Sequence, residues 1–354
     1  MNLVSPVYQV QATALLFPPG GYHWPGMGSD LDASADASGL FSRAEAALEE
    51  LGVEAGALRR LMAGEGQVQR LGEDGRWRWS GDFPLTEAAQ TLLGGALAEA
   101  FVRSHGEPRA VVGESMGEAA AYLASGALEL ESALQLVYRW AQALQLASDA
   151  LGLRMAVVEH PELARLELLL EEHRARVVIL ESPTLQVWSV PVAELAPLDH
   201  SVTELGGRTL VSNNPCAAHD LRLRGELGAF ERYFGLVEEL PLRPPRFPLW
   251  SAIRPGLPLR SVDELRANLR EMSFAPVRWA QALGGLPAQR VKNLLQLGAA
   301  PSGRYPLRKL CREEPRLRGC RTDTLGTLAA VAALPRRWRP AGEPGPEREE
   351  GPGG

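Results

Sequence analysis

Hydrophobic and polar residues alternate with two periods along the chain, and the pattern predicts an α/β fold. Short apolar runs at 10–17, 109–113, 247–253 and 291–298 have the length of buried strands. Apolar residues at helical spacing, or alanine-rich stretches, predict helices over 40–64, 85–104, 116–124, 129–147, 262–271 and 276–284. The segment 65–83 is polar and rich in glycine, which predicts a loop.

The scale of the pattern changes near residue 152. Shorter strand and helix signals follow one another there, in MAVVE, ELARLELLLEEHRA, RVVIL, LQVWSV and GRTLVS. We therefore expect a small α/β subdomain over 152–242, inserted between two parts of a larger domain at 1–151 and 243–334. The tail 335–354 is rich in Pro, Gly, Arg and Glu, and we expect it to be disordered.

Composition narrows the function classes. The net charge of −6 gives no reason to expect nucleic-acid binding. Three scattered cysteines predict neither a disulfide framework nor a metal site. No apolar run reaches the roughly 18 residues that span a bilayer, and the first residues lack a basic region, so we expect no membrane segment and no signal peptide. A cytoplasmic location is the resulting expectation.

One segment is strongly basic. Residues 302–321 hold seven arginines and lysines against two glutamates, a net charge of +5. A solvated face is the simpler interpretation. The alternative is a docking patch for an acidic carrier protein or for the phosphates of coenzyme A.

The sequence Gly113-Glu114-Ser115-Met116-Gly117 fits the nucleophile-elbow pattern G-x-S-x-G. An apolar strand precedes it and a helix follows, which is the structural context that the pattern requires. The two glycines allow the strand and the helix to approach closely. Ser115 would then be an exposed nucleophile, and the backbone N–H of Met116 would stabilise a developing oxyanion.

The chain resembles the malonyl-CoA:acyl-carrier-protein transacylases and the acyltransferases of polyketide synthases. Residues 113–118 are similar to the signature G-H-S-x-G-E, and the opening FPPGGYHWPGMG at 17–28 is similar to F-P-G-Q-G-x-Q-x-P-G-M-G. Ser212-Asn213-Asn214-Pro215 resembles an Asn-x-Pro element, and 247–251 with 274–279 resembles P-x-x-S followed by P-V-x-W. These matches keep their order from about residue 12 to 332.

The resemblance implies an α/β-hydrolase-like core with an inserted ferredoxin-like subdomain and an active site between them. It also implies a two-step reaction. An acyl group passes from coenzyme A to Ser115, and then to the phosphopantetheine thiol of an acyl carrier protein. Acyl-CoA and the carrier protein are substrates, and no bound cofactor is expected. Gly20, Gly21 and Glu87 fall where the family binds substrate.

The arginine that pairs with malonyl carboxylates in the family falls at Trp140 in this chain. Arg139 is adjacent, but neighbours on a helix point about 100° apart, so it is a poor substitute. Trp140 is either a core aromatic or the wall of an acyl pocket. Loss of the arginine predicts a preference for uncharged acyl groups over malonyl.

The family's general-base histidine also lacks an obvious counterpart. It lies in an A-F-H-S segment before the P-x-x-S strand, and we expect that segment to be deleted because 220–354 contains no histidine. We expect a helix to be missing with it, so that the mouth of the cleft is more open than in the family, and the nearest imidazole to Ser115 to be that of His23 or none. His200 and His219 are assigned to the small subdomain or its edge. Glu114, which replaces the family histidine before Ser115, is a doubtful alternative base because its charge would oppose an oxyanion.

Three functions follow from these residues. The first is an acyltransferase for uncharged acyl groups in fatty-acid or polyketide synthesis. The second is a catalytically impaired scaffold that binds a carrier protein, and the third is an editing acyl-carrier hydrolase. A histidine within about 3–4 Å of the Ser115 hydroxyl would favour the two enzymes over the scaffold.

Overall fold

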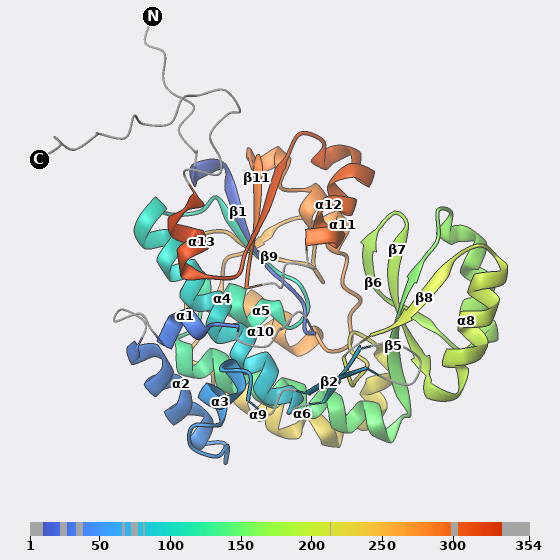
Figure 1. Ribbon diagram of the computed structural model, residues 1–354, viewed down its shortest axis with the longest axis horizontal. Coiled ribbons are helices and arrows are strands. Elements are labelled where there is room, and N and C mark those ends of the chain that lie inside the picture. The colour runs from blue at the N-terminus through green and yellow to red at the C-terminus, as the bar shows by residue number, and fades with distance from the viewer. Residues whose placement is uncertain are drawn as a thin grey trace, which may run out of the picture.

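The computed structural model describes residues 10–21, 27–32, 38–65, 68–71, 77–80, 82–212, 214–298 and 304–334. These residues form a six-stranded sheet, a four-stranded sheet and a two-stranded hairpin. The four-stranded sheet lies to one side of the larger α/β core (Figure 1). The predicted fold class, an α/β core with an inserted small subdomain, is confirmed.

The six-stranded sheet has the order β10-β9-β4-β1-β11-β12, and all its pairs are parallel except β10 with β9. Its strands are β1 (Thr13–Phe17), β4 (Ala110–Gly113), β9 (Leu249–Ser251), β10 (Pro258–Leu259), β11 (Asn293–Leu297) and β12 (Arg321–Leu325). Every residue of β1, β4, β9 and β11 is buried, which explains their nearly continuous apolar sequences. Strand β1 pairs with β4 and β11 in the middle of the sheet.

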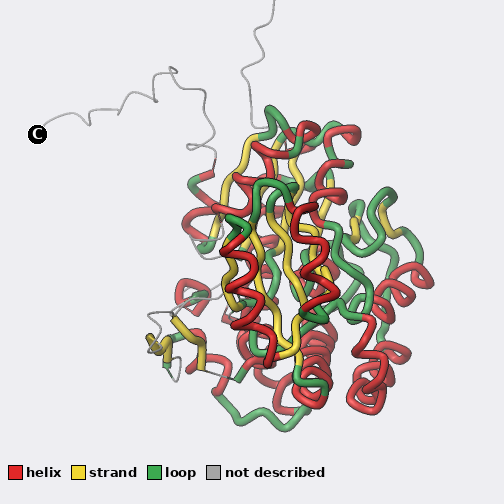
Figure 2. The backbone as a smooth tube through the Cα atoms, turned by 90° about the vertical axis from the view of Figure 1, so that its right-hand side faces the viewer, coloured by secondary structure: helices red, strands yellow, loops and turns green. Residues whose placement is uncertain are grey.

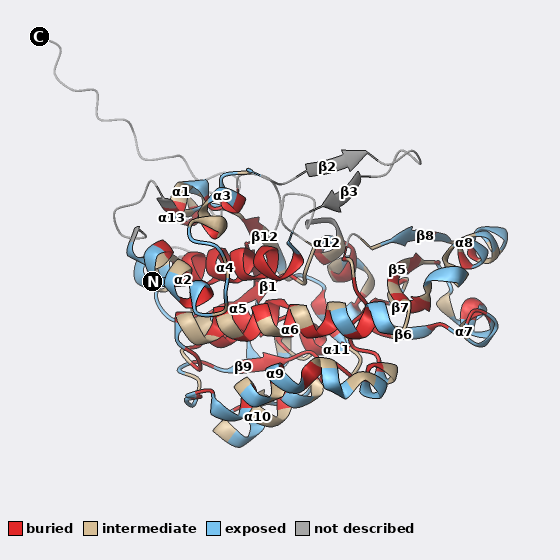
Figure 3. Cartoon of the chain, turned by 90° about the horizontal axis from the view of Figure 1, so that it is seen from below, coloured by how far each residue is buried: buried red, intermediate tan, exposed pale blue. Residues whose placement is uncertain are grey.

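Helices pack against the large sheet (Figure 2). The three that matter most for the site are α4 (Phe83–His105), α5 (Gly117–Ala124) and α6 (Leu130–Ala150). Helix α4 is buried along most of its length because it contacts both α5 and α6 (Figure 3). Its start is fixed by Asp82, whose carboxylate accepts a hydrogen bond from the Leu85 N–H.

The small subdomain follows the order β5 (Leu153–Glu159), α7 (Glu167–Glu172), β6 (Arg176–Ser182), β7 (Leu185–Pro191), α8 (Leu195–Glu204) and β8 (Arg208–Val211). Its strands pair antiparallel in the order β6-β7-β5-β8. This is the ferredoxin-like arrangement that the resemblance implies. The subdomain has a hydrophobic cluster of its own, which includes Val158, Trp188 and Leu198. It joins the core through β6, where Ile179 bridges to Val277.

Helix α9 (Leu227–Glu239) follows the small sheet and packs against α6. Its Phe230 and Tyr233 belong to the main hydrophobic cluster rather than to that of the small sheet. The small sheet itself spans residues 153–211, within the expected subdomain 152–242. The boundary at 242 stays a prediction.

Several elements differ from the sequence-based expectations. The expected helix over 40–64 is two helices, α2 (Ser38–Glu49) and α3 (Ala57–Met62), because Gly52 and Gly56 between them adopt positive φ. The expected loop over 65–83 contains the hairpin β2 (Val68–Leu71) and β3 (Trp77–Ser80). The last element expected from the sequence was the strand at 291–298. Three more elements follow it in the structure: α12 (Arg304–Glu313), the polar edge strand β12 and α13 (Leu328–Ala332).

The remaining helices are α1 (Ser29–Asp32), α10 (Val262–Glu271) and α11 (Trp279–Gly284). Helix α10 matches its predicted range and begins with a capping box between Ser261 and Glu264. The predicted disordered tail 335–354 lies outside the described residues.

Candidate active site

Ser115 lies on the turn between β4 and α5, as predicted. Its φ of 53° is in the left-handed region, which a non-glycine residue adopts only under constraint. A Cβ atom on Gly113 would lie 2.3 Å from the Cα of Glu118, and one on Gly117 would lie 2.4 Å from the Phe17 carbonyl oxygen. Only glycine therefore fits at either position, and the turn is a nucleophile elbow.

The imidazole of His219 contacts this serine. Its Nε2 atom lies 2.7 Å from Ser115 Oγ, and both residues are buried. Burial lowers the pKa of His219 to about 4, while the backbone of Met272 and Ala275 acts in the opposite direction. The imidazole is therefore neutral at pH 7. With its ring proton on Nδ1, Nε2 accepts the serine proton, which is the geometry of a general base.

The expectation of a site with no imidazole except that of His23 is wrong, because His219 occupies it. His23 itself lies outside the described residues. The segment Ala217-Ala218-His219-Asp220 follows β8 and precedes β9, as the family's A-F-H-S segment does, so it is not deleted. Its alanine and histidine were a usable signal. The match was missed because α9 separates His219 from β9, and the expected subdomain 152–242 therefore included His219.

The expectation of a missing helix is also wrong. Helix α9 fills the stretch between the base and β9, and its Tyr233 stacks on Trp140 with 6.4 Å between ring centroids. The cleft is thus not opened by loss of a helix from this stretch.

Trp140 packs beside the His219 imidazole. It is fully buried, and its ring meets that of His219 edge to face, with 6.2 Å between centroids. Its indole Nε1 donates a hydrogen bond to Ser273 Oγ at 2.7 Å. Arg139 points elsewhere, as its helical position predicts: it donates to Gln142 and lines a separate cavity. Trp140 is a core aromatic and at the same time a neighbour of the His219 imidazole that contacts Ser115.

The opening loop lies against the elbow. The Glu114 N–H donates to the Phe17 carbonyl at 3.0 Å, and Gln90 Nε2 donates to the carbonyls of Pro18 and Pro19. The carboxyl group of Glu87 faces Gly20, where an added Cβ would lie 2.8 Å from Glu87 Oε1. These contacts bring the predicted substrate-binding residues Gly20, Gly21 and Glu87 to the elbow.

Glu87 and Met116 line a small cavity of about 10 Å³ together with Phe17, Pro18, Gln90, Thr91, Gly94, Gly117, Ala120 and Leu297. Burial raises the pKa of Glu87 to about 8, and both of its carboxyl oxygens lack a hydrogen-bond donor of regular geometry. Glu87 is therefore protonated at pH 7. The cavity has room for about one water molecule.

Glu114 pairs with a second buried acid. Its carboxyl group is hydrogen-bonded to that of Glu181, which comes from β6 of the small subdomain. Burial and the neighbouring carboxyl raise the pKa of Glu114 well above its usual value, so the pair holds a proton. Glu114 is thus turned toward Glu181, which makes it a poor candidate for the base.

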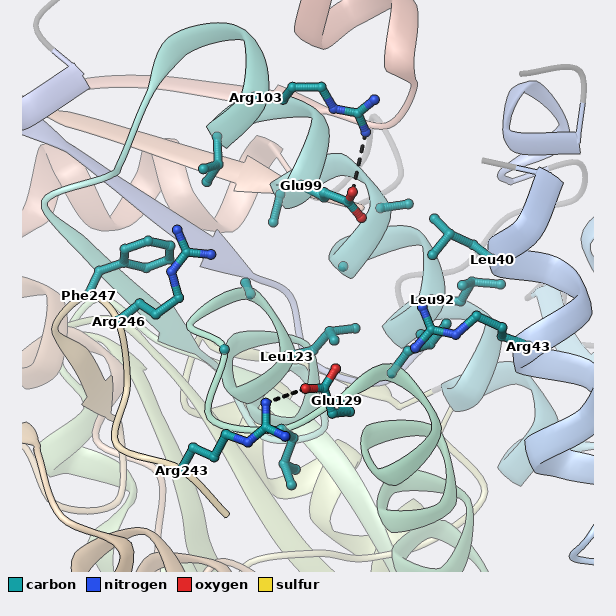
Figure 4. A pocket seen from close by; sticks show the side chains of 18 residues that line it. Leu40, Arg43, Leu92, Glu99, Arg103, Leu123, Glu129, Arg243, Arg246 and Phe247 are labelled. Atoms are coloured by element: carbon teal, nitrogen blue, oxygen red, sulfur yellow. Dashed lines mark hydrogen bonds and ion pairs between the residues drawn. The ribbon is translucent and has the colours of Figure 1, made fainter. Parts of the chain in front are cut away.

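Two cavities larger than the one lined by Glu87 and Met116 lie elsewhere. One of about 510 Å³ is enclosed by the last turns of α4, the end of α5, the start of α6 and residues 243–247 (Figure 4). It lies at the opposite end of α5 from Ser115. Its arginines are paired, Arg243 with Glu129 and Arg103 with Glu99, so it offers no free charge for chemistry.

Other kinds of site are not found in the part of the chain that the structure describes. It contains no group of three or more His, Cys, Asp or Glu side chains that could hold a metal ion. Within the same residues, no helix has both the length and the apolarity to cross a membrane.

Comparison with known proteins finds relatives, although no family model matches the chain. It is 26% identical over 336 residues to the polyketide biosynthesis protein ThaF of Burkholderia thailandensis, and 27% identical over 285 residues to the reducing polyketide synthase Preu2 of Preussia isomera. These matches cover 94% and 76% of this chain but 27% and 12% of those proteins. The chain thus spans only a part of the length of either relative.

Solved structures give the fold. The malonyl-CoA:acyl-carrier-protein transacylase of Coxiella burnetii superposes with a TM-score of 0.75 at 19% identity, covering 93% of this chain and 98% of that one. The acyltransferase domain of SpnD superposes with a TM-score of 0.74 at 23% identity, covering 92% and 76%. A malonyl transacylase solved in complex with a type II polyketide acyl-carrier protein gives 0.74 at 19% identity, covering 92% and 99%. The chain therefore has the fold of the malonyl-CoA:acyl-carrier-protein transacylases and of the acyltransferase domain of SpnD.

Proposed function

We propose that this protein is an acyltransferase that moves an uncharged acyl group from coenzyme A to a carrier protein through Ser115. The 2.7 Å contact between Ser115 Oγ and a neutral, buried His219 Nε2 carries the proposal. In the first step His219 takes the hydroxyl proton while the serine oxygen attacks the thioester carbonyl. The C–S bond then breaks, coenzyme A leaves as the protonated thiol, and the acyl group remains as a serine ester.

The second step reverses the first with another thiol. The phosphopantetheine thiol of the carrier attacks the serine ester, and His219 takes the thiol proton and returns it to Ser115. The helix N-terminus at Met116 supports an oxyanion site there, with the Met116 N–H as one donor and the loop at Gly20 and Gly21 opposite. We assign Glu87, in its protonated form, to holding that loop.

The preference for uncharged acyl groups rests on charge. Trp140 occupies the place of the family arginine, and Arg139 is bonded to Gln142 on another face of α6. Buried carboxyl groups also surround the elbow, those of Glu87, Glu114 and Glu181. A malonyl carboxylate would lose hydration without a cationic partner from α6, so its binding would be unfavourable.

The basic helix α12 supports a carrier protein as the acceptor. Glu313 on α12 accepts hydrogen bonds from Ser182 and Thr184, which follow Glu181 at the elbow. Helix α12 therefore borders the junction between core and small subdomain. Arg308 and Arg312 are exposed on it, whereas Lys309 turns inward to Glu159 and Glu313. An acidic carrier protein would be attracted to that face.

The catalytic pair also separates the alternatives. A scaffold has no need of a neutral histidine in contact with a strained serine, so the geometry favours an enzyme. An editing hydrolase would use the same two residues, with water in place of the carrier thiol. The two enzymes differ in what accepts the acyl group: the carrier thiol in the acyltransferase and water in the hydrolase.

Intact-mass measurement of the protein after incubation with acetyl-, butyryl- and malonyl-CoA tests the proposal. We expect acetyl or butyryl adducts that are absent from Ser115→Ala, and little malonyl adduct. Addition of a phosphopantetheinylated acyl carrier protein should then move the acyl mass to the carrier. Release of free acid at an unchanged rate with and without carrier would instead identify a hydrolase. No adduct with any thioester would contradict both enzyme functions.

A further inference from the structure

The turn that carries His219 is strained. His219 adopts a φ of 60°, a left-handed conformation that is costly for a non-glycine residue. Such a conformation persists only where surrounding contacts fix it. The residue that follows, Asp220, is almost completely buried and begins the 3-10 helix Leu221–Glu226.

Arg222 supplies the fixing contacts. Its backbone N–H donates to Asp220 Oδ1 at 2.8 Å, and its guanidinium donates to Asp220 Oδ2 from Nε at 2.9 Å and from Nη2 at 2.6 Å. The planar guanidinium thus holds the carboxylate next to the base in one orientation. This pairing keeps the pKa of Asp220 below its usual value although burial acts against it.

The same guanidinium also reaches the small subdomain. Nη1 donates to the Arg174 carbonyl at 2.8 Å, and Nη2 donates to the Ser189 carbonyl at 3.0 Å and to its hydroxyl at 3.1 Å. Arg174, just before β6, is itself a non-glycine residue with positive φ, 49°. Arg222 therefore ties two strained backbone positions together, one at the catalytic base and one at the edge of the small sheet.

We propose that Arg222, acting through Asp220, is a positioning residue that sets the His219 imidazole against Ser115 and registers the small subdomain to the base. The proposal rests on the proposed function for its kinetic consequence but not for its structural one. Arg222 touches neither substrate nor the reacting atoms. Its loss would leave a strained turn without its anchor, and the imidazole would move away from the serine hydroxyl.

Arg222→Ala tests the proposal, with Arg222→Lys as the conservative variant. Since displacement of a catalytic group by about 1 Å can cost about 10²-fold in rate, we expect Ser115 acylation at saturating butyryl-CoA to fall by that order. The butyryl-CoA concentration for half-maximal rate should change little, because Arg222 contacts Asp220, Arg174 and Ser189 rather than Ser115 or His219. Lysine keeps the positive charge but lacks the planar, forked guanidinium, so Arg222→Lys should restore the rate only in part.

Titration of the imidazole provides a readout that does not require activity. In ¹⁵N-histidine-labelled protein, with the His219 signal assigned from His219→Gln, the wild-type ring should stay neutral down to about pH 4. In Arg222→Ala the displaced ring should become hydrated, and its midpoint should move toward the ordinary value near 6.5. Lysine should return the midpoint toward the wild-type value.

Arg270→Ala is the matched control, because Arg270 forms a surface ion pair with Glu238 away from the base. It should change neither the rate nor the titration. Thermal unfolding of each variant identifies a protein that has simply failed to fold, and Arg222→Lys then carries the test. Wild-type acylation together with an unaltered rate and titration in Arg222→Ala would overturn the positioning role. If no thioester acylates the wild-type protein but the His219 titration still shifts in Arg222→Ala, the positioning role of Arg222 is retained and the proposed function is contradicted.

Discussion

The two turns that carry Ser115 and His219 reach the same kind of strained backbone in different ways. Ser115 and His219 both adopt positive φ, 53° and 60°. The turn at Ser115 is enforced locally, because Gly113 and Gly117 allow β4, α5 and the end of β1 to approach within backbone contact. The turn at His219 contains no glycine and is fixed by Arg222, whose contacts extend to Arg174 and Ser189 in the small subdomain.

The difference shows why one half of the pair is visible in the sequence and the other is not. A turn enforced by glycines leaves a pattern of fixed spacing, G-x-S-x-G. A turn whose anchoring side chain, that of Arg222, is in turn held by distant residues such as Arg174 and Ser189 leaves no pattern of fixed spacing. The small subdomain is therefore more than an insertion beside the cleft, because it contributes contacts next to both members, Glu181 to Glu114 and Ser189 to Arg222.

The largest expected effect comes from removing the base. His219→Gln keeps a side chain of similar length but cannot accept the serine proton, so acylation of Ser115 should slow by roughly 10²–10⁴-fold. Intact-mass time courses with butyryl-CoA measure the rate. His200→Gln is the control, because that imidazole is exposed and lies 3.3 Å from Glu204 Oε1 at the surface. Equal rates for the two variants would remove His219 from the mechanism.

The local character of the serine turn can be tested through its glycines. Gly117→Ala would place a methyl group 2.4 Å from the Phe17 carbonyl oxygen, and we expect a loss of roughly 1–3 kcal/mol in the free energy of unfolding. Urea denaturation measures it. Gly39→Ala, in α2 with no atom within 4 Å of the added methyl, should stabilise by about 0.5–1 kcal/mol. Equal free energies for both variants would show that the elbow tolerates a side chain.

Glu87, beside the serine turn, should make stability depend on pH. Its pKa is about 8 in the folded protein, against an ordinary value of 4.5. Between these values the folded protein keeps a proton that the unfolded chain has lost, so the free energy of unfolding falls as pH rises, by at most ~1.4 kcal/mol per pH unit. Glu87→Gln should flatten the curve in that window. Parallel curves from urea denaturation of the two proteins would mean that Glu87 ionises normally.

The smallest expected effect concerns the turn that carries His219: the acylation rate should hardly depend on pH. Because burial lowers the pKa of His219 to about 4, its imidazole stays neutral well below pH 7. The acylation rate at saturating butyryl-CoA should therefore hold nearly constant between about pH 5 and 7, where a histidine of ordinary pKa would lose most of its activity. A midpoint near 6.5 in the rate profile would show a hydrated imidazole and a looser base turn.

The sequence by itself determined the fold class, the elbow and the place of Trp140. Apolar runs such as those of β1 and β4 are long enough to be read as buried strands, and the glycines at 113 and 117 are required by backbone contact. Helical geometry alone placed Trp140 inward and turned Arg139 away. Each of these leaves a local pattern in the sequence, either a fixed glycine spacing or a periodicity that a single element imposes.

Only the tertiary structure decided which histidine serves Ser115. His219 lies 104 positions along the chain from the serine, and its two neighbours before it are alanines. Distant segments pack around this contact: Trp140 meets the imidazole edge to face, and Tyr233 of α9 stacks on Trp140. Arg222 anchors the turn through Asp220. The low pKa of His219 and the shared proton of Glu114 and Glu181 are decided in the same way. Burial sets them, and burial is a property of packed neighbours from distant segments rather than of local sequence.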